Sequence, residues 1–140
     1  MFSLILFYVK VFSFRRTIIS KIKIIKIMST VPFERGCHLF TGLGSNSRET
    51  ATSLETFAAK LETISALSLS FHLQRKDFQN WLRTTVGDDV LAERISHISL
   101  QLLVEKLRND LVETVQDHIS HLKLLYGEFI PSQGEPKPIP

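Results

Sequence analysis

A second cysteine is missing from this chain of 140 residues, whose only cysteine is Cys37. A single thiol cannot form an internal disulfide, so nothing indicates an oxidising compartment and a cytoplasmic location is predicted. Hydrophobic residues make up 44% of the chain and charged residues 22%, an ordinary globular composition with room for one domain. This composition excludes a disulfide scaffold, a collagen-like fibre and a large multi-substrate enzyme.

Motifs for phosphate or cofactor binding are missing as well. In the glycine-containing segment 41–47, Ser47 stands where a dinucleotide-binding loop has its third glycine, and no lysine follows the second glycine as in a Walker A loop. The segment is therefore predicted to be a flexible connection. Cys37 and His38 are adjacent, but neighbours in an extended segment point to opposite faces, so a buried structural thiol is expected. No catalytic residue and no cofactor are predicted.

Acidic residues are missing from residues 1–27, a segment that we call the leader and that holds six of the 17 basic residues. The rest of the chain carries 11 basic and 14 acidic groups, a net charge of −3, although the whole chain has a charge of +3. A mildly acidic domain lacks the basic surface that binds a phosphate backbone. No nucleic-acid partner is therefore predicted.

The leader is rich in Phe, Ile and Lys and contains no Ala, Gly or Pro. This composition is typical of translated A/T-rich DNA upstream of a gene, so the leader is predicted to be a mis-called or disordered basic segment before a start at Met28. Its apolar run, Phe2 to Phe14, contains Lys10 and is shorter than the roughly 20 residues of a transmembrane helix. The alternative is that residues 15–27, which mix Ile with Lys, lie on an anionic membrane surface.

Helical signals dominate the remaining sequence. A capping box from Thr52 to Glu55 predicts a helix over about 53–64. Apolar and polar residues alternate over 66–74, but a lone strand has almost no partner, so a helix is favoured there. Asp77 is predicted to cap a helix that ends at Gly87, and Asp88 to cap the next one.

A long helix is predicted from about Leu100 to Tyr126, ending at Gly127. Four prolines follow within residues 131–140. The sequence thus predicts an all-α, single-domain bundle of four to five helices over residues 28–127. It has an irregular N-terminal part over 29–49 and a flexible Pro-rich tail over 128–140.

The long helix carries ligand-type side chains at helical spacing. On a helical wheel His118 falls on the apolar stripe and His121 at its edge, whereas Glu113 and Asp117 lie off the stripe. A di-metal bundle needs inward carboxylates on several helices, and none is visible, so no metal site is predicted. Arg108 also lies on the stripe and is predicted to extend its charged end towards solvent.

The most interesting polar cluster consists of His72, Arg75, Asp77 and Trp81. A histidine near a carboxylate, beside a cation and an aromatic wall, suits binding of an anion or a sugar, or acid–base work. A structural interpretation serves equally well. In it Asp77 caps a helix, Trp81 fills the core with its N–H bonded to a carbonyl, and Arg75 pairs with Asp88 or Asp89.

The same region carries a family resemblance. Ser68-Leu69 and Phe71-His72, then Arg75, Asp77-Phe78 and Trp81, then Gly87-Asp88, Leu91-Ala92 and Ile95 follow the pattern SLxFH, RxDFxxW, GDxxLAxxI. The chain thereby resembles an uncharacterised prokaryotic helical domain family, a domain of unknown function, over about residues 33–126. The resemblance implies a helical fold and no reaction.

Two functions are compatible with these observations. The favoured hypothesis is a small cytosolic helical domain that acts as a protein-interaction or regulatory module with another protein as partner, and the sequence leaves open whether the chain is an enzyme. The alternative is a small-molecule (anion or sugar) binding protein or enzyme that uses the His72, Arg75, Asp77 and Trp81 cluster. The alternative requires His72, Arg75 and Asp77 to converge on an open, concave pocket.

Overall fold

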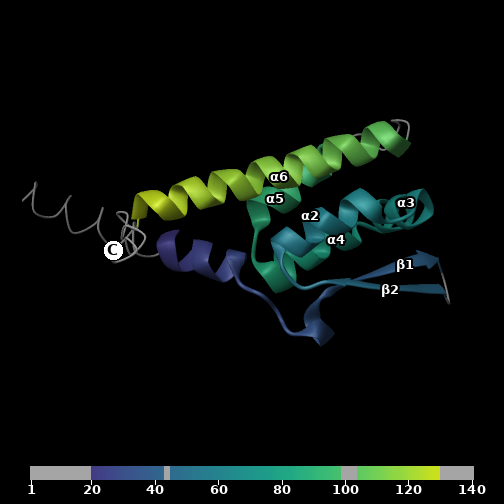
Figure 1. Ribbon diagram of the computed structural model, residues 1–140, viewed down its shortest axis with the longest axis horizontal. Coiled ribbons are helices and arrows are strands. Elements are labelled where there is room, and N and C mark those ends of the chain that lie inside the picture. The colour runs from purple at the N-terminus through teal and green to yellow at the C-terminus, as the bar shows by residue number, and fades with distance from the viewer. Residues whose placement is uncertain (1–19, 43–44, 99–103, 130–140) are drawn as a thin grey trace, which may run out of the picture.

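The computed structural model describes residues 20–42, 45–98 and 104–129 (Figure 1). After a helical segment at residues 20–28 and a 3₁₀ turn, two strands precede the remaining helices. In chain order these elements are η1 (Phe33–Arg35), β1 (Cys37–Gly42), β2 (Ser45–Ala51), α2 (Leu54–Thr63), α3 (Ala66–Arg75), α4 (Asp77–Trp81), η2 (Leu82–Val86), α5 (Asp89–Ser96) and α6 (Val104–Phe129). The predicted Pro-rich tail lies almost entirely outside the described residues.

The hairpin of β1 and β2 corrects the all-α prediction, since the chain is mostly helical but includes this two-stranded antiparallel sheet. Its register pairs Cys37 with Ala51 and Leu39 with Glu49, and a bulge follows Leu39. Cys37, Leu39 and Ala51 are buried, so one face of the sheet packs on the helices. The segment predicted to be irregular is therefore partly a strand pair, because residues 37–42 find their partner in β2.

The helices after the hairpin form largely where they are predicted, with different caps. The N-cap of α2 is Ser53, whose hydroxyl accepts from the Thr56 N–H, so the capping box lies one residue later than predicted and does not use Glu55. Residues 66–75 are helical, which confirms the prediction for the alternating segment. Asp88 caps α5 as predicted, by accepting from the Leu91 N–H at 2.9 Å.

The junction between α3 and α4 differs from the prediction. Lys76 has φ 61°, a left-handed conformation, and it separates the two helices without a side-chain cap. Asp77 is the first residue of α4 and does not cap it, so its carboxylate is free to contact another group. After Trp81 the chain continues as the π-helical turn η2, which ends at Gly87 with φ 83°, where a left-handed residue was expected.

The long helix α6 extends two residues beyond Gly127, where it was predicted to end. Leu107, Leu111, Val115 and Leu122 are buried as predicted, whereas Tyr126 is 40% exposed, and the predicted start at Leu100 lies outside the described residues. In Figure 1 α6 covers one side of the helical layer that includes α2 and α4, and the hairpin lies on the other side. None of the helices among the described residues is both long and apolar enough to cross a membrane.

Residues 20–28 form a helix that lies beside the C-terminal end of α6 (Figure 1). Ile24 and Ile27 are each 5% exposed and belong to the hydrophobic core cluster. The domain boundary at Met28 stays a prediction, and removal of the leader would uncover the side chains that these two isoleucines touch.

A chain that begins at Met28 is expected to remain soluble and helical, with a free energy of unfolding lower by no more than about 2 kcal/mol. Burial of two isoleucines favours the helix, but the backbone entropy lost in ordering it offsets most of that gain. Circular dichroism during urea unfolding of the full and shortened chains measures the difference. Aggregation or loss of helical signal in the shortened chain would make residues 20–27 part of the domain.

Candidate functional site

The predicted cluster is built around His72, which α3 places against both β1 and α4. His72 is 1% exposed. Its Nε2 accepts the backbone N–H of Phe40 at 2.8 Å, and its Nδ1 lies 2.8 Å from Asp77 Oδ2. One imidazole thus joins the hairpin, α3 and α4.

These two contacts fix the position of the imidazole proton. A backbone N–H is always a donor, so the Nε2 atom that accepts from Phe40 carries no proton. The proton of His72 therefore sits on Nδ1 and is donated to the Asp77 carboxylate. Aromatic rings surround the imidazole, with the Phe71 and Phe78 ring centroids at 5.2 and 5.4 Å. Both nitrogens of His72 are occupied, and neither is available to a ligand.

Arg75 and Trp81 contact different parts of this cluster. Arg75 Nε lies 3.5 Å from Asp77 Oδ2, so the predicted pairing with Asp88 or Asp89 is wrong. The guanidinium also lies 4.9 Å from the centroid of the Phe71 ring, and the side chain is 56% exposed. Trp81 donates its indole N–H to the Arg35 carbonyl at 3.0 Å, as the structural interpretation predicted.

All four residues of the cluster line one shallow concavity of about 230 Å³. This volume is below the roughly 300–1,000 Å³ of typical ligand pockets. The alternative function required His72, Arg75 and Asp77 to converge on one pocket, and the three side chains do converge here. Of the three, only Arg75 has hydrogen-bond donors that a ligand could use. Sequence reasoning missed that the hairpin contributes to this wall, because the β1 strand had not been predicted. The residues that line it together with the cluster are Gly36, Cys37, His38 and Phe40.

Cys37 lies in this wall as an unreactive thiol. Burial, and secondarily the negative charge of Asp77, raises the pKa of the Cys37 thiol from 9.0 to about 12. His38 does not pair with it, because the His38 ring is bonded through Nδ1 to the Thr50 hydroxyl on the opposite strand at 2.9 Å. A thiol–imidazole nucleophile is therefore not formed.

Alkylation of Cys37 by iodoacetamide at pH 8 is expected to be about a thousandfold slower in the folded than in the urea-unfolded chain. The thiolate is the reacting species, and its fraction at pH 8 falls from about one in ten to about one in ten thousand when the pKa rises. Because ionisation is disfavoured only in the folded state, stability is also expected to fall between pH 9 and 12. Mass spectrometry measures the alkylation, and equal rates in both states would contradict burial of the thiol.

A second buried histidine, His118 of α6, lies outside this cluster. Its Nε2 is 2.7 Å from Asp88 Oδ2, and the two residues are 4% and 2% exposed. Asp88 thus caps α5 with one oxygen and holds α6 with the other. His121 is exposed, so the two histidines do not converge. Among residues 20–42, 45–98 and 104–129, no group of three or more His, Cys, Asp or Glu side chains is arranged to hold a metal ion.

Arg108 also bonds within the fold, to a backbone carbonyl that the helical wheel of the long helix did not predict. Its guanidinium donates to the Leu61 carbonyl in the last turn of α2 at 2.9 Å, and the side chain is only 13% exposed. The end of α2 leaves carbonyls without a helical partner, so this cation stabilises it. The prediction that Arg108 reaches towards solvent is wrong.

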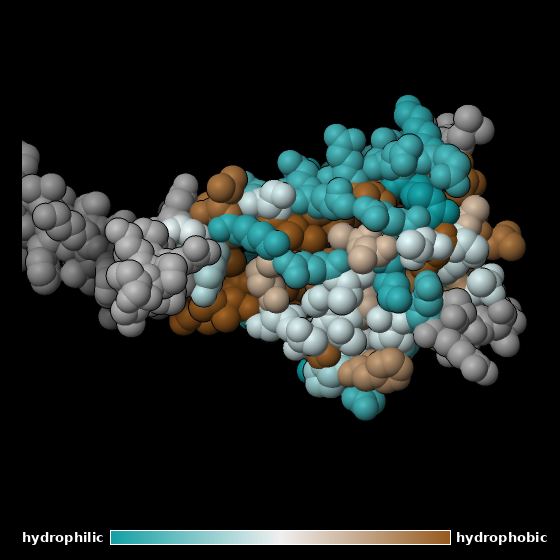
Figure 2. All heavy atoms as spheres, in the orientation of Figure 1, coloured by the Kyte–Doolittle hydropathy of each residue, from teal (hydrophilic) through white to brown (hydrophobic). Residues whose placement is uncertain are grey.

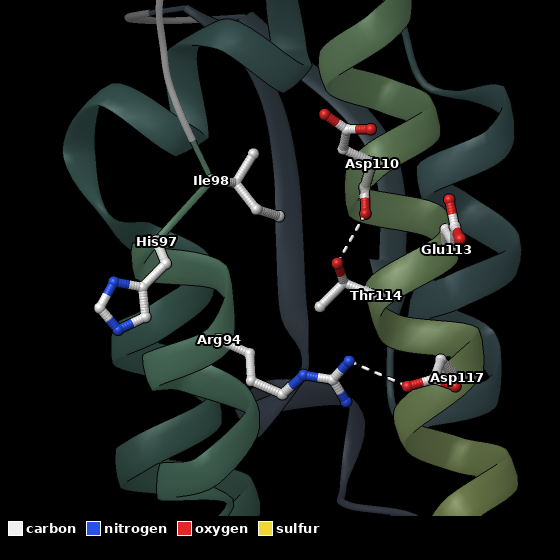
Figure 3. A pocket seen from close by; sticks show the side chains of 7 residues that line it. All are labelled: Arg94, His97, Ile98, Asp110, Glu113, Thr114 and Asp117. Carbon is white, nitrogen blue, oxygen red and sulfur yellow. Dashed lines mark hydrogen bonds and ion pairs between the residues drawn. The ribbon is translucent and has the colours of Figure 1, made fainter.

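A polar cleft of about 510 Å³ lies between the end of α5 and α6 (Figure 3). In it Arg94 donates to Asp117 at 2.9 Å, and the Thr114 hydroxyl donates to the Asp110 carbonyl. Glu113 and Asp117 are exposed here, as their positions off the apolar stripe predicted. The side chains at this cleft form an exposed, solvated surface with one ion pair across it.

Comparison with protein families places most of the described helices in a known family. A family of unknown function (DUF5752) matches residues 43–128, which include the whole His72 cluster. The predicted resemblance to a domain of unknown function is thereby confirmed, whereas its prokaryotic origin and sequence pattern stay predictions. No curated protein and no solved structure matches significantly.

Proposed function

Because the chain belongs to this family of unknown function, which assigns it no reaction, we propose from its own residues that it is a small cytoplasmic protein-interaction or regulatory module. The observation that carries the proposal is the hydrogen bonding of the His72 ring. Both of its ring nitrogens are bonded within the fold, to Phe40 and to Asp77. The cluster therefore holds the hairpin on the helices. A partner protein would then bind the outer surface of the domain.

The outer surface offers apolar side chains to a protein partner. Leu67 on α3 is 73% exposed, Phe33 is 63% exposed and Val90 on α5 is 60% exposed. Arg75 lies on α3 two helical turns after Leu67 and stacks on Phe71. Aromatic residues and arginine are enriched in protein interfaces, where they supply contact area and directional hydrogen bonds.

The proposal is tested by recovering the affinity-tagged full chain from its native cells. We expect a partner protein in stoichiometric amount, and its loss when one exposed apolar residue is replaced, for example in Leu67→Glu. Arg83→Gln is the matched control on another helix, since among the residues that the structure describes its charge pairs with the exposed Glu93 alone. Absence of a partner, or recovery that no exposed apolar substitution changes, would contradict an interaction module.

Binding of an anion or sugar is the second candidate, and one observation favours it. His72, Arg75, Asp77 and Trp81 do line a single concavity, and the Arg75 guanidinium is exposed there. A ligand that binds the folded chain raises its melting temperature. If phosphate or a simple sugar raises the melting temperature of the full chain, and Arg75→Gln abolishes the rise, this second function replaces the first.

A further inference from the structure

The helix at residues 20–28 is apolar on two opposite sides. Ile24 and Ile27 are 5% exposed and face the core, whereas Ile22 and Ile25 are 61% and 45% exposed. At about 100° per residue, the second pair lies on the far side of the helix from the first. An amphipathic surface helix needs only one apolar stripe, so the outer pair is not explained by folding.

The outer side of this helix continues onto α6. Ile25 and Met28 form a groove of about 290 Å³ with Lys123 and Tyr126 of α6. Figure 2 shows hydrophobic residues gathered at this end of the molecule, over the helix at residues 20–28. We call Ile22, Ile25, Met28 and Tyr126 the end patch. It joins two elements that are far apart in the sequence.

Cations border the end patch. Lys23 and Lys26 are exposed and lie on the same helix as Ile22 and Ile25, together with the half-buried Lys21. The leader has no acidic residue, whereas the rest of the chain has a net charge of −3. Lys123 also borders the groove, but its ammonium group pairs with the Glu55 carboxylate at 2.8 Å. Among the described residues, the helix at residues 20–28 thus carries three lysines and no acidic side chain beside the end patch.

We propose that the end patch docks on an anionic lipid surface, with Ile22 and Ile25 entering the interface and the lysines contacting lipid phosphates. Apolar side chains flanked by lysines on one helix match the two layers of a bilayer surface, the acyl boundary and the charged headgroups. This inference develops the alternative that residues 15–27 lie on a membrane surface. It does not depend on the proposed interaction with a protein.

A second copy of the chain fits the end patch less well. A two-fold symmetric dimer brings the same surface of both copies together, and here that surface carries Lys23 and Lys26. Like charges would then face each other across an apolar contact. An anionic bilayer attracts the same lysines and covers the same isoleucines, so charge complementarity favours the bilayer.

The test is sedimentation of the full chain with vesicles of phosphatidylcholine alone or with about one third phosphatidylglycerol. We expect binding to the anionic vesicles that is at least about tenfold stronger than to the neutral ones and that weakens with salt. The double variant Ile22→Ser/Ile25→Ser should bind about tenfold more weakly, and Lys23→Gln/Lys26→Gln should lose a similar factor. All four side chains are outside the core, and circular dichroism confirms that the variants fold.

Lys106→Gln is the matched control for the lysine variant, because Lys106 is an exposed lysine in the first turn of α6, at the other end of that helix from Tyr126. It should bind vesicles like the unchanged chain. Equal affinity for neutral and anionic vesicles would overturn the proposal, and so would unchanged binding of the Ile22→Ser/Ile25→Ser variant. Concentration-dependent dimers that this variant abolishes, without vesicle binding, would assign the end patch to a second copy instead.

Discussion

Replacement of Trp81 with alanine is expected to lower the free energy of unfolding by about 3–5 kcal/mol, as for other buried tryptophans. Trp81 is 7% exposed, and its ring centroid lies 5.4 Å from that of Phe57. Its indole N–H also bonds the Arg35 carbonyl, which ties the segment before β1 to α4. Truncation would therefore remove both core volume and a link between two parts of the chain.

Trp81→Phe is the control that separates these two effects. Phenylalanine keeps most of the aromatic packing and loses the bond to Arg35, so we expect a loss of about 1–2 kcal/mol. Urea unfolding followed by circular dichroism measures both variants. An unchanged unfolding midpoint in Trp81→Ala would show that Trp81 lies on the surface and would return it to the candidate binding residues.

Replacement of Asp88 with alanine is expected to cost about 2–4 kcal/mol. One carboxylate oxygen accepts the Leu91 N–H at the start of α5, and the other contacts His118 at 2.7 Å. Loss of the cap costs about 1 kcal/mol, and a buried polar group left without its partner adds about 1–3 kcal/mol. Both losses follow from one side chain, because Asp88 joins α5 to α6.

The two contributions of Asp88 can be measured separately. Asp88→Asn retains an oxygen that caps α5, so it should cost less than Asp88→Ala. Asp89→Ala is the matched control, since Asp89 is exposed and has neither contact, and its effect should stay within about 0.5 kcal/mol. Equal losses for Asp88→Ala and Asp89→Ala would show that neither the cap of α5 nor the buried contact with His118 contributes to stability.

Much of the helical architecture could be predicted from local signals. Gly87, the Asp88 cap and the apolar spacing of α6 act within a few residues, so they are visible in the sequence. The helix at residues 66–75 was also predicted, because its alternating pattern had too little chain nearby to form a sheet. These features depend on short-range contacts and on burial of a single face.

The hairpin and the role of Asp77 could not be predicted, because both depend on partners distant in the sequence. Strand β2 has no apolar alternation, and β1 is its only partner among the described strands. Asp77 is a residue type that commonly caps helices. Because Lys76 adopts a left-handed conformation, however, the Asp77 carboxylate lies next to His72. The hydrogen bond from the Phe40 N–H to His72 joins residues 32 positions apart, so no local sequence pattern predicts it.

The central claim is that His72 is an internal junction and not a ligand-binding group. The most direct measurement is nitrogen NMR of the His72 ring in the folded chain at neutral pH. We predict a proton on Nδ1, a bare Nε2, and a scalar coupling between Nε2 and the Phe40 amide nitrogen across their hydrogen bond. His118 provides an internal comparison, because its Nε2 faces the Asp88 carboxylate and should carry a proton. A proton on Nε2 of His72, with no coupling to Phe40, would contradict the account and return this histidine to the candidate binding site.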